Sequence, residues 1–180
     1  SSLNLKYLDH LTPIMGKNSG NWKPLYEMLL NHNVLRMIKA QGYEFHHYGT
    51  WWYPTSKNKY ADENINLNDA LSEFSMIMFE TTIFRIADYV QYFDHRYDHW
   101  ERVNYKMQKL KEVPENKAQT FVFAHMLIPH KPFIFNSDGS FVSPDEIKGR
   151  GYEKNFINQL KYTNVLIKNL VETILENSEQ

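Results

Sequence analysis

Apolar residues near the amino terminus recur at the three- and four-residue spacing of helices. Residues 3–11 carry leucines at this spacing and predict a short helix. Pro24 fits the first turn of a second helix, which runs through Leu29. A third helix is predicted with Asn33 as its N-cap and Gly42 as its stop. The chain up to Gly42 is therefore expected to be mostly helical.

Two apolar segments have the composition of β-strands. Residues 43–48 are rich in aromatic residues and directly follow a helix stop. Residues 120–127 (TFVFAHML) form an uninterrupted apolar run, which is typical of a central parallel strand buried on both faces. The stretch between the first strand and residue 67 predicts a long irregular loop. Helix, glycine and strand in succession predict an α/β fold with a mainly parallel sheet.

Two longer helices are predicted later in the chain. The apolar residues of 79–100 alternate spacings of four and three and predict one long helix or two, with the pattern extending to Met107. Residues 156–174 repeat the same spacing and predict a long amphipathic helix near the carboxyl terminus. Between them, Asp138 followed by Gly139 marks a turn.

The composition places the chain among globular proteins and excludes several classes of function. The 180 residues are 42% hydrophobic and 23% charged, which suits a single globular domain over residues 1–180. The net charge of −1 lacks the basic footprint of nucleic-acid binding, so no nucleic-acid partner is expected. The absence of cysteine excludes disulfides, thiolate metal sites and a cysteine nucleophile. No apolar run reaches the roughly 18 residues that a membrane span needs.

Both predicted strands end in residues that suit a binding site. The first delivers His46 and His47 and is followed by Trp51 and Trp52, and the second delivers His125. Ligands of open α/β sheets bind beyond the carboxyl ends of the strands, so these groups are candidates for one site. The alternative is that the histidines are hydrogen-bonded core residues, which we favour for His125, and that the tryptophans cap the core.

The segment after the second strand adds a histidine and a lysine. His130 and Lys131 stand between Pro129 and Pro132, where two prolines forbid regular structure. Both side chains can donate hydrogen bonds to phosphate or sulfate oxygens. For His130 we favour a functional role over a structural one, and the expected ligand is an anionic ester.

A second histidine pair, His95 and His99, has the four-residue spacing of a possible zinc pair on a helix. The pair lacks the intervening general-base glutamate of a metalloprotease signature and lies off the apolar stripe, so we favour a solvated helix face. The sequence also contains no P-loop, no dinucleotide-binding glycine fingerprint and no G-x-S-x-G elbow.

Four segments together resemble one protein family. They are SSLNLKYLD, GYEFHHYGTWW, FVFAHMLIPHKPFIFNSDGS and the helical FINQLKYTNVLI. They resemble the sulfatase-like proteins of the alkaline phosphatase superfamily, and among these the membrane-anchored group that includes lipoteichoic-acid synthases and related hydrolases. The H-K-P-F sequence, an H-x-P-F element after a central strand, is the most specific of these features.

This resemblance implies a partial three-layer αβα sandwich of alkaline-phosphatase type. Such proteins bind a divalent cation (Zn, Mn, Mg or Ca) and attack phosphate or sulfate esters with a Ser, Thr or formylglycine nucleophile. In them the SSLN-like segment follows the nucleophile, and a metal-binding Asp-His-Gly follows the helix that corresponds to residues 152–177. Neither the nucleophile nor this motif is found here. The resemblance therefore implies an internal fragment of the catalytic domain, inactive and without a metal ion on its own.

The resemblance also implies substrate-binding positions. His130 matches the substrate-contacting histidine of the H-x-P-F element, and Lys131 is a weaker candidate. The strand-end histidine of the family falls at His47 or at the next residue, and the tryptophan that follows falls at Trp51 or Trp52. The parent protein would act outside the cytoplasm as a hydrolase or transferase, and the oligomeric state is left open. The alternative is a non-catalytic binding or interaction module whose aromatic and histidine-lined loop recognises a sugar or a peptide.

Overall fold

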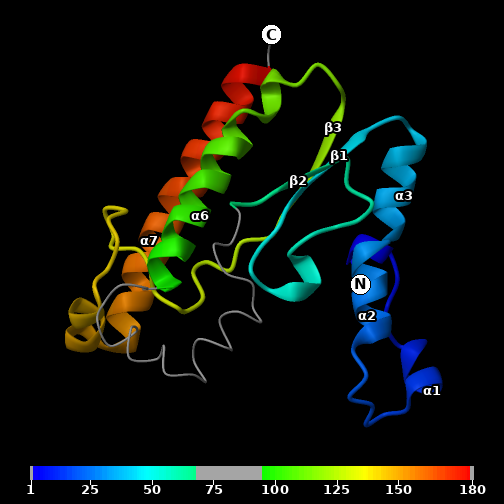
Figure 1. Ribbon diagram of the computed structural model, residues 1–180, viewed down its shortest axis with the longest axis horizontal. Coiled ribbons are helices and arrows are strands. Elements are labelled where there is room, and N and C mark those ends of the chain that lie inside the picture. Colours follow the sequence, from blue (N-terminus) through cyan, green and yellow to red (C-terminus); the bar gives the residue numbers. More distant parts are fainter. Residues whose placement is uncertain (1, 68–94, 179–180) are drawn as a thin grey trace, which may run out of the picture. The chain divides into compact units, whose positions relative to one another are not determined.

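The computed structural model describes residues 2–67 and 95–178 (Figure 1). These residues form two compact units. The first comprises the described parts of Ser1–Asn66 and Glu115–Met126, and the second comprises those of Leu67–Pro114 and Leu127–Gln180. The greater part of the helix predicted over residues 79–100 lies outside the described residues. The prediction of a single domain over residues 1–180 stays a prediction.

The first unit contains a three-stranded parallel sheet. The strands β1 (Glu44–Tyr48), β2 (Glu63–Ile65) and β3 (Thr120–Ala124) lie in the order β2-β1-β3 (Figure 1). The register pairs Glu44 with Thr120 and Tyr48 with Ala124. This arrangement confirms the predicted α/β class with a parallel sheet.

The central strand of the described sheet is β1, which corrects the prediction that residues 120–127 are central. Every residue of β1 after Glu44 is buried, whereas β3 is only half-buried and has one strand neighbour in the described sheet. Phe45 is fully buried, with its ring 5.8 Å from that of Phe121 on β3. The apolar run of β3 indicated a strand but not its place in the sheet, because the second partner of β1 comes from a polar sequence.

That second partner is β2, which lies within a stretch predicted to be wholly irregular. Its sequence, Glu-Asn-Ile, is too short and polar to show a strand pattern. The pairing is set by tertiary contacts: the Asp62 backbone N–H donates to the Phe45 carbonyl oxygen at 2.9 Å, and the Gly49 N–H donates to the Ile65 carbonyl oxygen at 3.2 Å. Asp62 also accepts from the Phe45 N–H at 2.8 Å, and this bond, with Lys39 beside it, lowers the pKa of Asp62.

Helices and short 3-10 turns precede the sheet in the first unit. They are η1 (Ser2–Asn4), α1 (Leu11–Met15), α2 (Lys23–Leu30) and α3 (Asn33–Ala40), and a further turn, η2 (Tyr53–Thr55), follows β1. The helix predicted over residues 3–11 is wrong: Leu5 has a φ of 52°, which ends η1 and turns the chain out of helical geometry. The helices predicted at Pro24 and before Gly42 are confirmed as α2 and α3.

The N-cap of α3 is His32 rather than the predicted Asn33. The buried His32 ring accepts a hydrogen bond at its Nδ1 from the Leu35 backbone N–H at 2.9 Å. An imidazole thus replaces the usual hydroxyl or carboxylate cap, which the sequence rules for caps do not anticipate. Burial, with a smaller contribution from the charge of His47, lowers the pKa of His32 and keeps the ring in the neutral form that can accept this bond.

The second unit contains two long helices and the loop that leads into the second of them. Helix α6 (His95–Lys111) is followed by η3 (Val113–Glu115), and α7 (Pro144–Ser178) contains a kink at Gly151. The two helices pack side by side (Figure 1). Within the described residues, no helix combines the length and the apolar composition that a membrane span requires.

A turn in the loop between β3 and α7 packs against both helices. Phe135 and Phe141 form an antiparallel bridge, and Gly139 at the tip has a φ of 90°, which confirms the predicted turn. The Gly139 carbonyl oxygen accepts from Nε1 of Trp100 on α6 at 3.0 Å. A Cβ atom at Gly139 would lie 2.2 Å from the Tyr162 ring of α7, so only glycine fits there.

The turn after β1 offers a test of the close packing in the first unit. A Cβ atom added to Gly49 would lie 2.0 Å from the carbonyl oxygen of Ser56. We expect Gly49→Ala to lower the free energy of unfolding by about 2 kcal/mol or more, because backbone must move to relieve the overlap. Urea unfolding measures the change. Gly20→Ala is the matched control, since no atom lies within 4 Å of its added Cβ, and an equal loss in both variants would contradict the packing described here.

Candidate functional site

The carboxyl edge of the sheet in the first unit carries an aromatic and polar cluster. His125, the residue after β3, has its Nδ1 2.8 Å from Oγ1 of Thr55. The Trp52 ring stands edge-on to the His125 ring at 6.0 Å, and the Tyr26 ring of α2 stands edge-on to Trp52 at 6.3 Å. These contacts fix the orientation of His125 at the edge where parallel sheets bind ligands.

The two histidines inside β1 point to opposite faces of the strand. His47 is 2% exposed, and its Nε2 donates to the Thr55 carbonyl oxygen at 3.0 Å. Its ring stacks on Phe123 at 5.4 Å. His46 is also buried and lies between two carboxylates, with Nε2 3.3 Å from Glu44 and Nδ1 3.5 Å from Glu63. Both rings are held by protein groups in the sheet, which favours a structural role for them.

The two tryptophans of the loop after β1 remain accessible. Trp51 is 47% exposed and Trp52 is 39% exposed, although Trp52 is held between the Tyr26 and His125 rings. A fixed indole with one open side can form the wall of a pocket. Of the residues predicted at this edge, the structure thus brings Trp52 and His125 together and adds Thr55, which the sequence did not single out.

Two buried oxygen atoms next to this edge have no hydrogen-bond partner in the described part of the chain. They are Oγ1 of Thr50, two residues after β1, and Oδ1 of Asn66, directly after β2. An unpaired buried oxygen costs roughly 1–3 kcal/mol, so such atoms call for a water molecule or a ligand group. The ends of the strands therefore carry unpaired polar atoms next to aromatic side chains.

His130 and Lys131 belong to the second unit and are exposed. Neither side chain has a hydrogen bond or ion pair within the described residues, so both are available to an external anion. The predicted rim that they would share with Trp51 and Trp52 stays a prediction.

The backbone around His130 is fixed by the side chain of Gln159, a fully buried residue of α7. Its amide nitrogen donates to the carbonyl oxygens of Pro129 at 3.0 Å and His130 at 2.8 Å. Its amide oxygen accepts from the backbone N–H groups of Ile134 at 2.7 Å and Phe135 at 3.3 Å. One side chain thus satisfies four backbone groups of a loop that has no regular structure, and it determines where His130 is presented.

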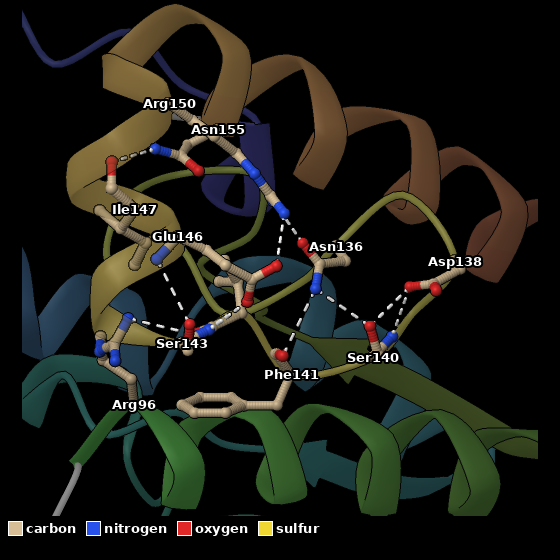
Figure 2. A network of polar contacts seen from close by, with 11 residues as sticks. Arg96, Asn136, Asp138, Ser140, Phe141, Ser143, Glu146, Ile147, Arg150 and Asn155 are labelled. Atoms are coloured by element: carbon tan, nitrogen blue, oxygen red, sulfur yellow. Dashed lines mark hydrogen bonds and ion pairs between the residues drawn. The ribbon is translucent and has the colours of Figure 1, made fainter.

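A second polar network fixes the far end of the same loop (Figure 2). Ser143 and Glu146 form a capping box at the start of α7, with bonds of 2.9 and 3.3 Å between each side chain and the backbone N–H of the other. Arg150 donates to both Glu146 and Asn136. The Asn155 side-chain amide donates to the carbonyl oxygens of Ile147 and Gly151 and so spans the kink. Both ends of the His130 loop are therefore tied to α7.

His99 is buried, which corrects the interpretation of the 95–99 segment as a solvated helix face. It is 5% exposed, and neither ring nitrogen has a partner among the described residues. Burial, together with the nearby charges of Lys106 and Arg102, lowers its pKa to about 4. Two neighbouring cations oppose metal binding at this ring, so the arrangement does not favour the zinc-pair hypothesis. The side chain of His95 lies outside the described residues.

The metal ion that the family resemblance implies has no matching ligand set in the described part of the chain. No three or more His, Cys, Asp or Glu side chains come close enough there to hold an ion. We therefore assign no chemical step of this chain to a metal.

Comparison of the chain with protein-family models, with curated protein sequences and with solved structures found no match.

Two of the residues that shape these candidate sites carried some signal in the sequence. Gln159 interrupts the apolar stripe of the last helix between Phe156 and Thr163, and a polar residue on a buried face needs buried partners. Thr55 follows Pro54 in a loop, and the sequence gives no specific signal for it beyond the general expectation that long loops are functional. Its role depends on a contact with His125, which is 70 residues away in the sequence.

The contribution of Gln159 can be measured directly. We expect Gln159→Leu to lower the free energy of unfolding by roughly 3 kcal/mol, because it leaves the buried N–H groups of Ile134 and Phe135 unpaired. Chemical denaturation and amide hydrogen exchange at these two residues give the measurement. Thr163→Val is the matched control on the same face of α7, since it removes only a bond to the Gln159 carbonyl oxygen, and its cost should stay below about 1 kcal/mol. A Gln159→Leu variant as stable as this control would refute the role assigned to the amide.

The burial of His99 predicts a pH dependence of stability. The folded pKa of about 4 lies below the usual 6.5, so the unfolded chain takes up a proton at His99 before the folded chain does. The contribution of His99 to the free energy of unfolding is therefore fully present above pH 6.5 and is lost as the pH falls towards 4. The difference in unfolding free energy between the unchanged chain and His99→Leu should shift by roughly 3 kcal/mol across this range, in favour of the variant. A difference that stays constant with pH would contradict the burial.

Proposed function

We propose that this chain is part of a sulfatase-like, metal-dependent hydrolase or transferase that acts on phosphate or sulfate esters. The proposal rests on the resemblance of its motifs to the alkaline phosphatase superfamily and on an α/β fold with a parallel sheet. The observation that carries it is the Gln159 contact, which holds the backbone of an exposed histidine and lysine in place. The side chains of His130 and Lys131 are hydrogen-bond donors that face solvent from a fixed backbone, so they can bind the oxygens of an anionic ester.

In this proposal the residues of this chain bind and orient the ester. His130 and Lys131 donate hydrogen bonds to its anionic oxygens, and His130 stabilises charge that develops on them during the reaction. Because Gln159 holds the loop before the ester arrives, little ordering cost is incurred on binding. Trp51 and Trp52 of the first unit are further candidate substrate contacts by the family resemblance, and His47 supports their loop from within the sheet by its bond to Thr55.

The remaining parts of the reaction belong to residues other than these 180. A divalent cation (Zn, Mn, Mg or Ca) would supply Lewis-acid activation in the intact protein. The family resemblance also places such a protein outside the cytoplasm and attached to a membrane.

A non-catalytic binding module is the second candidate, and one observation favours it. The loop after β1 exposes several aromatic side chains in a short stretch: Trp51, Trp52, Tyr53 and Tyr60 are between 38% and 72% exposed. Exposed aromatic rings are the usual surfaces for stacking on sugars or peptide side chains.

An anion titration tests the role of His130. We expect phosphate and sulfate to shift the ring resonances of His130 in NMR spectra of the purified chain, with affinity in the millimolar range. His130→Ala should abolish binding at this loop, and Gln159→Leu should weaken it, whereas Lys154→Ala, an exposed position on α7, should leave it unchanged. Insensitivity of His130 to both anions would remove the basis of the proposal.

Turnover assays separate the proposed fragment from a complete enzyme. The isolated chain should not hydrolyse aryl phosphate or aryl sulfate esters, and it should bind no divalent metal tightly. Metal-dependent hydrolysis by these 180 residues would show that the nucleophile and the ligands are present after all.

A further inference from the structure

A pocket of about 560 Å³ lies in the first unit, and its lining includes none of the residues predicted as a site. It is lined by residues of η1 and of the segment that follows it, of α2 and α3, and of the loop before β2. Those that matter here are Asn4, Lys6, Glu27, Arg36, Lys59 and Tyr60. We call it the Arg36 pocket. Its volume falls in the range of sites for small molecules.

The Arg36 pocket has an excess of positive charge. Three cations, Lys6, Arg36 and Lys59, line it against one carboxylate, Glu27, which leaves a net charge of +2 with His10 neutral. A phosphate monoester carries a charge of about −1.5 to −2 at pH 7 and would neutralise this excess. The charge balance therefore favours a dianion over a neutral or cationic ligand.

Two of the three cations of the pocket are held by neutral groups rather than by carboxylates. Arg36 donates to the side-chain oxygen of Asn33, and the Lys59 ammonium lies 5.0 Å from the centre of the Tyr60 ring. Within the described residues none of the three cations forms an ion pair, whereas Lys39 of the same unit pairs with Asp62 at 2.9 Å. The three charges are thus not neutralised by carboxylates and remain available to an anion, and those of Arg36 and Lys59 are also held in place.

The wall of the pocket is preformed by a set of asparagine bonds. Asn4 donates to the Met28 carbonyl oxygen at 2.8 Å and accepts from the Asn33 backbone N–H at 3.3 Å. The Asn33 side chain donates in return to the Asn4 carbonyl oxygen at 2.7 Å. These bonds tie η1 to α2 and α3, so binding needs little rearrangement of the wall. One further amide group in the lining, that of Asn31, offers donors and an acceptor for ligand hydroxyl groups.

We propose that the Arg36 pocket binds a small sugar phosphate. Arg36 and Lys59 contact the phosphate oxygens through charge-assisted hydrogen bonds, and the asparagine amides contact the hydroxyl groups of the sugar. This site is separate from the ester-binding role proposed for His130 and does not depend on it.

Titration of the full 180-residue chain with glucose 6-phosphate, inorganic phosphate and glucose tests the proposal. Glucose 6-phosphate should shift the NMR signals of the Asn4, Asn31 and Asn33 side-chain amides. Glucose should have no effect at the same concentration, and phosphate alone should bind about tenfold more weakly, because it makes only the charged contacts. Equal binding of glucose and its phosphate would overturn the assignment of an anion site. Equal binding of phosphate and the sugar phosphate would overturn the sugar part.

Charge variants identify the contacts. Arg36→Gln should weaken glucose 6-phosphate binding about tenfold and Lys59→Gln about fivefold, because each removes a charge-assisted contact. Glu27→Gln removes the opposing carboxylate and should tighten binding about threefold. A gain of affinity cannot arise from partial unfolding, so this variant keeps the test decisive even if the others are less stable.

Two control variants test whether these changes in affinity are specific to the Arg36 pocket. Lys17→Gln removes an exposed positive charge outside the pocket and should change affinity by less than about twofold, and His130→Ala should have no effect. The proposal fails if Lys17→Gln weakens binding as much as Arg36→Gln, or if His130→Ala abolishes the asparagine shifts.

Discussion

Buried backbone groups that helices and strands leave unpaired need other partners, and polar side chains supply them at several points of the described chain. His32 accepts the N–H of Leu35 where α3 begins, and Asp62 accepts the N–H of Phe45 where β1 begins. Gln159 does the same for four groups of the loop between β3 and α7. Without these bonds each backbone group would give up its hydrogen bond to water on folding and gain no other. The free-energy cost of one such group is a large share of the net stability of a domain. The loop before α7 is thus held in place although it has no regular structure.

This constraint separates the structural histidines from those that remain available. His32, His46 and His47 lie in or next to the sheet with their rings bonded to protein groups. His130 is the opposite case, because its backbone is held while its side chain is exposed. A fixed backbone with an open side chain is the arrangement expected of a binding residue, since the entropy of the loop is already lost before a ligand arrives. His125 lies between these cases, oriented by Thr55 and Trp52 but half-buried.

The two anion sites that we propose differ in how they attract a ligand. At the His130 loop, geometry dominates: one imidazole and one ammonium group stand on a segment tied at both ends to α7. In the Arg36 pocket, charge dominates: three cations surround one hollow, and neutral side chains hold two of them in place. Long-range attraction weakens in salt, whereas a preformed hydrogen-bond geometry depends on it much less. The ionic-strength dependence of binding therefore distinguishes the two kinds of site.

The local signals in the sequence were sufficient for the α/β class, for α2 and α3, for the first strand and for the turn at Gly139. Each of these depends on interactions between residues close in the chain, such as a proline in a first turn or a glycine that ends a helix. The place of His130 after a strand, beside Lys131, and the family resemblance both directed attention to it, but neither spacing nor composition indicated what holds it. That contact joins residues 29 positions apart.

Tertiary structure alone decided the order of the strands, the burial of His99 and the formation of the Arg36 pocket. β2 has no apolar pattern and exists because its backbone completes the pairing of β1. His99 belongs to a polar stretch of sequence, yet the packing of α6 removes it from water. The cations of the pocket are scattered between Lys6 and Lys59 and gather only when η1, α3 and the loop before β2 come together. Pairing, burial and charge density are properties of neighbours in space, which no local pattern of residues records.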